Sequence, residues 1–319
     1  MPDTVYTPEQ VASQASMLGN RVRKRHAHLM RKFEREGIEA FRLYDWDIPE
    51  IRAVVDWYAG HIVIAEYERR QTGPDWLPTM ADAVGQALSI PPDRVHQKRR
   101  RTAVEDGPRY APAAGKGERF PVRERDLQFL VNLSNRLDTG LFSDHRDTRQ
   151  IVQALAAKSD FLNLYAYTGT FTCSAAQGGA KSTCTVDRSH TYLDWARDNL
   201  AHNGLDGPEH EMVAADAMRH LEHMGREGRT FTLAVVDPPS FSGTHAGTEF
   251  EILRDHPELL RKVLAVMAPG SVVFFSTNHQ RFEPRLGDLA CLSVREITPD
   301  TIPEDYRNRR VHRCWRIEV

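Results

Sequence analysis

The sequence predicts an α/β protein whose main domain has a mostly parallel sheet with helices on both faces, preceded by a small α+β domain. Apolar, strand-like runs alternate with amphipathic helical segments from about residue 160 to residue 277. This alternation is typical of a parallel sheet. Four successive runs end in a Thr-Gly turn or an aspartate, and the first third of the chain lacks the alternation.

In that first third, a basic helix is predicted at 16–36, because Leu18, Val22 and Phe33 recur at helical spacing and Gly37 is a suitable end. Three strand-like runs follow, AFRLYD, AVVDWY and HIVIAEY, and then a helical pattern. A stretch rich in Gly, Pro and charge predicts a loop that ends at residue 122. We therefore expect a flexible tail at 1–15, a small α+β domain at 16–122 and a larger α/β domain at 123–319.

Composition excludes several classes of protein. The chain has 319 residues, 40% of them hydrophobic and 27% charged, and no apolar run approaches the roughly 18 residues of a membrane helix. The N-terminus is polar and lacks the apolar core of a signal peptide. The four cysteines form no CxxC pair, so we expect no zinc site and no disulfide framework. These features favour a cytoplasmic protein without a metal.

Charge is distributed unevenly although the net charge is only −2. Basic residues cluster at 21–35 and at 98–101, and such clusters on a near-neutral protein suggest a surface that binds phosphates. Either cluster alone is more simply a solvated surface. The candidate RNA contacts are Arg21, Arg23, Lys24, Arg25, Arg99 and Arg100.

The second half of the chain contains five predicted strands of the main sheet. Residues 161–164 form the first, which a Thr-Gly turn and a small-residue helix follow. The next three strands end at or near Asp187, Asp216 and Asp237, and SVVFFSTN forms the fifth. Ligands bind at the carboxyl ends of such strands. Gly169 lets the backbone approach a ligand closely, Asp187 is placed to bind both hydroxyls of a ribose, and Asp216 is placed to meet an adenine amino group.

The turn after the first strand distinguishes between two nucleoside cofactors. A dinucleotide site requires the pattern G-x-G-x-x-G, so that the pyrophosphate can lie on the helix N-terminus. Here the turn reads YAYTG, with Tyr165 and Tyr167 where glycines would stand. S-adenosyl-L-methionine carries no phosphate and therefore fits this turn better than NAD.

These motifs carry a family resemblance. NLYAYTG, TVD, AD and VVDPPSF resemble the class I S-adenosylmethionine-dependent methyltransferases, whose domain is Rossmann-like with a mostly parallel seven-stranded sheet. The stretches at 20–50, 137–146 and 305–315 resemble the guanine-N7 half of the bifunctional bacterial 23S ribosomal RNA methyltransferase. The resemblance implies an enzyme that methylates ribosomal RNA, naked or in an assembling particle, and releases S-adenosyl-L-homocysteine.

The resemblance also implies roles for particular residues. Three of them, on the turn before the first strand, would close over the cofactor: Asp144, His145 and Arg146. Others would line the cofactor from its methionine end to its adenine: Asn163, Tyr165, Thr168, Gly169, Asp187, Asp216 and Ala217. The methyl group and the incoming base would be faced by Asp237, Pro238, Pro239, Ser240 and Phe241. The C-terminal RNA contacts would be Asn308 and His312.

Guanine N7 suits these residues, because its in-plane lone pair needs no deprotonation before it attacks a sulfonium methyl group. Positioning then supplies most of the acceleration. Asp237 would orient the base through its N1–H or exocyclic amine, and Phe241 either stacks on the base or packs in the core.

Three alternatives are open. Cytosine-C5 transfer needs a thiolate nucleophile, but Ser240 and Asn278 occupy the two candidate positions. Guanine-N2 and adenine-N6 enzymes usually carry an aromatic ring directly after the prolines, whereas here Ser240 intervenes. The third is an RNA-binding module that has lost cofactor binding, which the intact glycine and aspartates disfavour.

Overall fold

The chain divides into two compact units. The computed structural model describes residues 5–100, 118–134, 138–242 and 250–319, with only the backbone for residues 241 and 242. The first unit comprises residues 1–143 and 304–307, and the second comprises residues 144–303 and 308–319. The chain therefore passes between the units three times.

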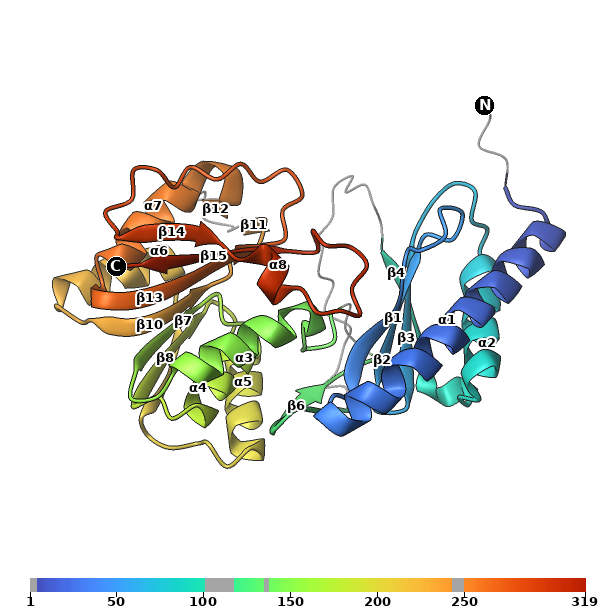
Figure 1. Cartoon of the computed structure of the whole chain (residues 1–319), viewed down its shortest axis with the longest axis horizontal. Coiled ribbons are helices and arrows are strands. Elements are labelled where there is room, and N and C mark those ends of the chain that lie inside the picture. Colours follow the sequence, from blue (N-terminus) through green and yellow to red (C-terminus); the bar gives the residue numbers. More distant parts are fainter. Residues whose placement is uncertain (1–4, 101–117, 135–137, 243–249) are drawn as a thin grey trace. The chain divides into compact units, whose positions relative to one another are not determined.

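The first unit is built on a four-stranded sheet with the order β1-β2-β3-β4. Its strands are β1 (Ala40–Asp45), β2 (Ala53–Tyr58), β3 (His61–Tyr67) and β4 (Val95–Arg100). The first three are antiparallel, and β4 runs parallel to β3. Two helices, α1 (Pro8–Glu36) and α2 (Trp76–Leu88), lie side by side on one face of this sheet and share one apolar core with it (Figure 1). A short 3-10 turn, η1 (Pro92–Arg94), leads into β4.

The first helix begins earlier than we predicted from the sequence. Thr7 and Gln10 form a capping box, in which each side chain bonds the backbone N–H of the other residue. Gln14 is buried and accepts a hydrogen bond of 2.6 Å from Nε1 of Trp76. The expected flexible tail at 1–15 is therefore wrong from residue 8 onward, because a capped helix with buried side chains occupies that stretch. Its end at Gly37, with φ +67°, agrees with the prediction.

The boundary between the units also differs from the one expected at 122/123. A hairpin of β5 (Phe120–Glu124) and β6 (Leu127–Val131) belongs to the first unit. Its turn is bonded to the end of α1, since Arg125 N–H donates to the Gly37 carbonyl and Glu39 N–H donates to the Arg123 carbonyl, both at 2.9 Å. The first unit also holds residues 304–307, where Asp305 accepts from the backbone N–H of Arg42 at 2.8 Å. These bonds tie the hairpin and residues 304–307 to the first unit, and the boundary lies at 143/144.

The second unit contains a mostly parallel seven-stranded sheet, which confirms the expected fold class. The strands are β7 (Asp160–Leu164), β8 (Ser182–Asp187), β9 (His210–Ala214), β10 (Phe231–Val236), β13 (Met267–Thr277), β14 (Ser293–Glu296) and β15 (Arg313–Glu318). Their order is β14-β15-β13-β10-β7-β8-β9. The last five in this order are parallel, and β14 and β15 pair antiparallel. The order reverses at β7, and ligands bind outside the carboxyl ends at such a switch point.

Helices cover both faces of this sheet (Figure 1). On one face lie α3 (Arg146–Leu155), α4 (Thr170–Gln177) and α5 (His190–His202), and on the other lie α6 (Ala217–Arg226) and α7 (Ile252–Leu264). Successive strand residues face opposite cores, as with Phe161 toward α3 and α4, and Leu162 toward α6 and α7. A short helix, α8 (Thr298–Thr301), and a two-residue ladder of β11 (Phe241–Ser242) with β12 (Phe250–Glu251) complete the unit. No helix in the described part of the chain is both long and apolar enough to cross a bilayer.

Candidate active site

The loop between β7 and α4 has the left-handed backbone conformation typical of glycine, although two of its residues are tyrosines. Tyr165, Tyr167 and Gly169 have φ of +58°, +51° and +71°. A left-handed backbone costs a non-glycine residue about 1–2 kcal/mol. At Gly169 the constraint is also steric, because an added Cβ would lie 2.6 Å from the Cβ of Ala196 on α5. The loop therefore keeps the tight turn expected at the cofactor and stores strain, as functional loops do.

Asp187 ends β8 and lies against this loop. Its carboxylate accepts hydrogen bonds from the backbone N–H groups of Tyr167 at 2.9 Å and Ser189 at 2.8 Å. Burial raises the pKa of the Asp187 carboxyl, and these N–H groups partly counteract that shift. Each oxygen retains a second lone pair. The carboxylate is thus fixed in orientation and can still accept two hydroxyl groups, the chemistry predicted for a ribose.

Asp216 follows β9 and caps the N-terminus of α6, where it accepts from the backbone N–H of Arg219 at 3.1 Å. Nε of Arg188 lies 3.5 Å from the same carboxylate. Burial and Asp216 together raise the pKa of Tyr165, the largest cause being burial. Ala217, the next residue, is buried. Arg188 was not singled out from the sequence, although a basic residue directly after the strand-end Asp187 was a visible signal.

Two other expected cofactor residues form hydrogen bonds in the interior. Asn163 is 1% exposed, and its Nδ2 donates to Oγ1 of Thr172 at 3.0 Å. Thr168 is fully buried, and its carbonyl accepts from Nδ2 of Asn199 at 2.8 Å. The first bond joins β7 to α4, and the second holds the loop to α5. A role in lining the methionine end of the cofactor stays a prediction for both.

The Asp-Pro-Pro-Ser corner follows β10 as predicted. Asp237 is held from one side by Ser276 of β13, whose Oγ donates to Oδ1 at 2.6 Å. Pro238 is buried and Pro239 is exposed. Ser240 donates from Oγ to Oδ1 of Asn278 at 3.1 Å. The two positions where a C5 enzyme would need a cysteine are thus occupied by two polar side chains bonded to each other.

Phe241 pairs through its backbone with Glu251 in the short β11–β12 ladder. Its side chain lies outside the described part of the structure, so its stacking on a base stays a prediction.

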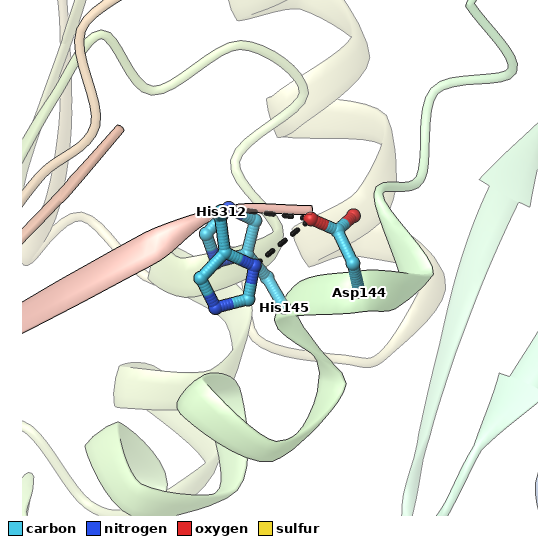
Figure 2. A group of neighbouring side chains, drawn as sticks. All are labelled: Asp144, His145 and His312. Atoms are coloured by element: carbon cyan, nitrogen blue, oxygen red, sulfur yellow. Dashed lines mark hydrogen bonds and ion pairs between the residues drawn. The ribbon is translucent and has the colours of Figure 1, made fainter. Parts of the chain in front are cut away.

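Three buried side chains lie close together (Figure 2): Asp144, His145 and His312. Asp144 and His145 lie in a 3-10 turn, η2 (Ser143–His145), and Arg146 begins α3. They were expected on the turn just before the first strand, but helix α3 separates them from β7. Nε2 of His145 lies 3.5 Å from Oδ2 of Asp237. Arg146 is 2% exposed, and its predicted closure over a cofactor is not tested.

His312 corrects a prediction, because it was expected to contact RNA. The residue is 1% exposed and therefore cannot meet a phosphate in this structure. Its Nδ1 lies 3.0 Å from Oδ2 of Asp144, and its Nε2 lies 3.0 Å from Oγ1 of Thr301. The Thr301 hydroxyl donates to the Thr298 carbonyl at 3.0 Å, so it accepts from His312. Both ring nitrogens of His312 therefore have hydrogen-bond partners, which fix the orientation of the ring.

His145 differs from His312 in its hydrogen bonding. Its ring stacks on His312 with the centroids 4.2 Å apart and the planes at 12°. Burial lowers the pKa of His145, and the neighbouring His312 lowers it further. Nδ1 has no hydrogen-bond partner among the described residues, whereas Nε2 faces Asp237. A neutral ring with its proton on Nε2 therefore fits this site best.

The same cluster has the composition of a metal site. Asp144, His145 and His312 each offer one ligand atom, and these atoms lie within 4.8 Å of one another. However, in-plane lone pairs of two nearly parallel rings do not converge on one ion, and both nitrogens of His312 already have partners. The geometry favours a hydrogen-bonded network.

The basic residues predicted on the first helix divide into two groups. Arg23 and Lys24 are exposed on α1, and their side chains form no hydrogen bond or ion pair with other described residues. Arg21 forms an ion pair with Asp47, and Arg25 donates to the Glu304 carbonyl at 3.0 Å. Arg23 and Lys24 are therefore the more available for a polyanion.

The remaining candidates lie on β4 and near the C-terminus. Arg99 donates to the Pro74 carbonyl at 2.6 Å, and Arg100 lies 3.8 Å from Asp138. Asn308 is exposed, and its Oδ1 accepts from the backbone N–H of Arg310 at 3.0 Å. Contact of these three with RNA stays a prediction.

Comparison with known proteins identifies the class of this site. Residues 45–299 match the model of the S-adenosylmethionine-dependent methyltransferase family. The chain is 41% identical over 307 residues to the ribosomal RNA large subunit methyltransferase K of Neisseria meningitidis, covering 93% of this chain and 86% of that protein. It is 40% identical over 312 residues to the ribosomal RNA large subunit methyltransferase K/L of Alcanivorax borkumensis, and there it spans only 43% of the relative's length.

Solved structures show the same fold. The chain superposes with a TM-score of 0.76 on SMU.776, a putative methyltransferase complexed with SAH, at 21% identity and with 96% of this chain and 82% of that one covered. A putative SAM-dependent methyltransferase from Streptococcus mutans gives a TM-score of 0.75 at 20% identity, with 96% and 81% covered.

Proposed function

The chain belongs to the S-adenosylmethionine-dependent methyltransferase family, in the group of the large-subunit ribosomal RNA methyltransferase K, and from this premise we propose that it methylates N7 of a guanine in 23S ribosomal RNA. The observation that carries the choice of atom is the Asp237 corner. There a carboxylate is held at the end of β10, and no cysteine stands at either position that C5 chemistry would use. N7 is the guanine atom that reacts without losing a proton.

The cofactor fits the residues at the strand ends. S-adenosyl-L-methionine, when bound, supplies an electrophilic methyl group on a sulfonium. The left-handed loop at Tyr165 and Tyr167 brings backbone against the ligand, and Gly169 lets α4 begin close to α5. Asp187 presents two fixed oxygens to the ribose hydroxyls. Asp216 at the next strand end accepts from the adenine amino group.

Asp237 orients the base in the transfer step. A carboxylate accepts well from the N1–H and exocyclic amine of guanine, which leaves N7 on the opposite edge directed toward the methyl donor. Ser276 fixes one carboxylate oxygen, and His145 faces the other with Nε2–H. The hydrogen bond and the neighbouring ring restrict rotation of the carboxylate, and such positioning is the main source of acceleration when no general base is needed. The stacked His312 and its partner Asp144 in turn hold the His145 ring.

The cysteines support guanine over cytosine. Cys173, Cys184 and Cys314 are buried, and burial raises the pKa of Cys173 and Cys184 to about 12. A nucleophile for C5 transfer must be a thiolate near neutral pH. All four cysteines are free, which fits the reducing cytoplasm in which we place the enzyme.

In this proposal the first unit binds the RNA. Arg23 and Lys24 of α1 would bind phosphates, and affinity would fall with salt. A guanine inside a ribosomal helix must be extruded at a cost of a few kcal/mol. The substrate is therefore naked RNA or an assembling particle.

The decisive experiment identifies the methylated nucleoside. The protein is incubated with tritium-methyl S-adenosylmethionine and unmodified 23S RNA, and the RNA is then digested to nucleosides. We expect label only in N7-methylguanosine and expect Asp237→Asn to reduce it strongly. Label in N2-methylguanosine or 5-methylcytidine would overturn the choice of atom. Tight S-adenosylhomocysteine binding without transfer to any RNA would overturn the choice of substrate.

A further inference from the structure

The loop between β1 and β2, residues 45–52, carries an exposed tryptophan on a strained backbone. Trp46 is 41% exposed and has φ of +53°. The left-handed conformation costs a bulky residue about 1–2 kcal/mol. A small residue would remove that strain, yet the position carries a large ring that is packed on one side only. Strain of this kind points toward a functional surface. We call residues 45–52 the Trp46 loop.

One arginine of this loop and three from distant parts of the sequence lie around it. Arg52 lies 4.8 Å from the centroid of the Trp46 ring. Arg69 donates to the Glu50 carbonyl at 2.5 Å, and Arg307 donates to the Asp47 carbonyl at 2.6 Å. The fourth, Arg21, pairs with the Asp47 carboxylate. All of them belong to the first unit.

Three of these arginines contact neutral groups. Arg52 lies against a ring, and Arg69 and Arg307 are bonded to backbone carbonyls. A carbonyl satisfies one N–H of the guanidinium and leaves the positive charge uncompensated. Each guanidinium has five N–H donors, so several remain for a second acceptor. The loop also carries three acids, of which Asp45 pairs with Arg42 and Asp47 pairs with Arg21. The three guanidinium groups and the carboxylate of the exposed Glu50 are therefore the charges left around the aromatic side chain.

The loop is held from inside by a buried hydroxyl. Tyr44 Oη donates to one of two carbonyls, Ile51 at 3.0 Å or Ile48 at 3.3 Å, and accepts from the Ile48 N–H at 3.0 Å. Trp46 also stacks on Tyr67 of β3, with the centroids 5.8 Å apart and the planes at 23°. An ordered surface loses little entropy when a ligand binds it.

We propose that the Trp46 loop binds a single-stranded segment of RNA, with a base stacked on the Trp46–Arg52 pair and the adjoining phosphates on Arg69 and Arg307. Aromatic rings and guanidinium planes are the surfaces on which unpaired bases stack, and arginine binds phosphate through two parallel N–H groups. This inference rests on the proposed function for the choice of RNA. It adds a second contact area to the basic residues of α1.

The test measures RNA binding without any methyl donor. A fluorescein-labelled single-stranded RNA of mixed sequence is titrated with the full chain, and anisotropy gives Kd. Glycine suits the left-handed backbone of position 46, so Trp46→Gly relieves the strain, but it also removes the ring's contacts with Tyr67 and Arg52. We expect Trp46→Gly to raise Kd about tenfold while the protein stays folded at the assay temperature, and Trp46→Phe to retain most of the affinity. An unchanged Kd for Trp46→Gly overturns the proposal.

Charge is tested separately. Arg69→Gln with Arg307→Gln should reduce the slope of log Kd against log salt by about 1.4, the value for two phosphate contacts on a single strand. Arg226→Gln, an exposed arginine on α6, is the matched control and should leave the slope unchanged. Equal slopes for the double variant and the control overturn the phosphate assignment. If the methylated nucleoside is not N7-methylguanosine but Trp46→Gly still weakens RNA binding, the proposed target atom is wrong and the proposed RNA-binding surface at the Trp46 loop is supported.

Discussion

Gly169→Ala tests whether the tight entry to α4 builds the cofactor site. The added Cβ would lie 2.6 Å from the Cβ and 3.2 Å from the Cα of Ala196, so the backbone of α4 or α5 must move. Overpacking of this kind costs about 1–3 kcal/mol, and a left-handed alanine costs about 1–2 kcal/mol. Together they predict a destabilisation of about 2–5 kcal/mol.

Gly204→Ala is the matched control. Gly204 has φ of +68°, and an added Cβ there meets nothing within 4 Å. In this variant only the left-handed backbone destabilises the folded state, by about 1–2 kcal/mol. The lower conformational entropy of the unfolded chain with alanine offsets part of that destabilisation. The difference between the two variants therefore isolates the contact with α5.

The assay combines thermal unfolding with titration of S-adenosylhomocysteine by calorimetry. At about 2–4 °C per kcal/mol for units of this size, Gly204→Ala should lower Tm by a few degrees, and Gly169→Ala should lower it by about twice as much or more. We expect affinity to fall at least tenfold for Gly169→Ala alone. Equal Tm values with unchanged affinity for both variants would refute the reasoning.

Three further predictions concern single groups of the site and of α1. Asp187→Asn should weaken S-adenosylhomocysteine binding at least tenfold in calorimetry. Because the pKa of Asp187 is raised, wild-type affinity should fall as pH drops and the carboxyl takes up a proton, whereas the variant should show a flat profile between pH 5 and 8. His145→Leu should lower kcat with little change in KM for the cofactor, and His145→Gln should restore part of it; a rise in KM alone would instead place the ring at the cofactor. Arg23→Glu with Lys24→Glu should weaken RNA binding in anisotropy and leave S-adenosylhomocysteine affinity intact, and joint loss would contradict this.

Residues at the carboxyl ends of the parallel strands could be predicted from sequence. Asp187, Asp216 and Asp237 each follow an apolar run, and parallel strands bring their carboxyl ends to one edge of the sheet. The same rule predicted the position of Gly169. The start of α1 could also have been predicted from the sequence, since Thr7 and Gln10 match the capping-box pattern.

Residues that meet through tertiary folding could not be predicted in this way. Asp144 and His312 are 168 residues apart in the chain, and no local periodicity connects them. His312 was therefore expected to contact RNA on the resemblance alone, although folding buries it. The arginines around Trp46 are similarly scattered, and only the packing of the first unit brings them to one loop.

The path of the chain at residues 304–307 affects how the protein can be divided. These four residues belong to the first unit, where Asp305 satisfies a backbone N–H of β1 and Tyr306 bonds Ser143. A fragment that stops at residue 143 lacks this segment, and one that starts at residue 144 carries it with nothing to dock against. Any exchange of the first unit between related proteins must therefore carry residues 304–307 along with residues 1–143.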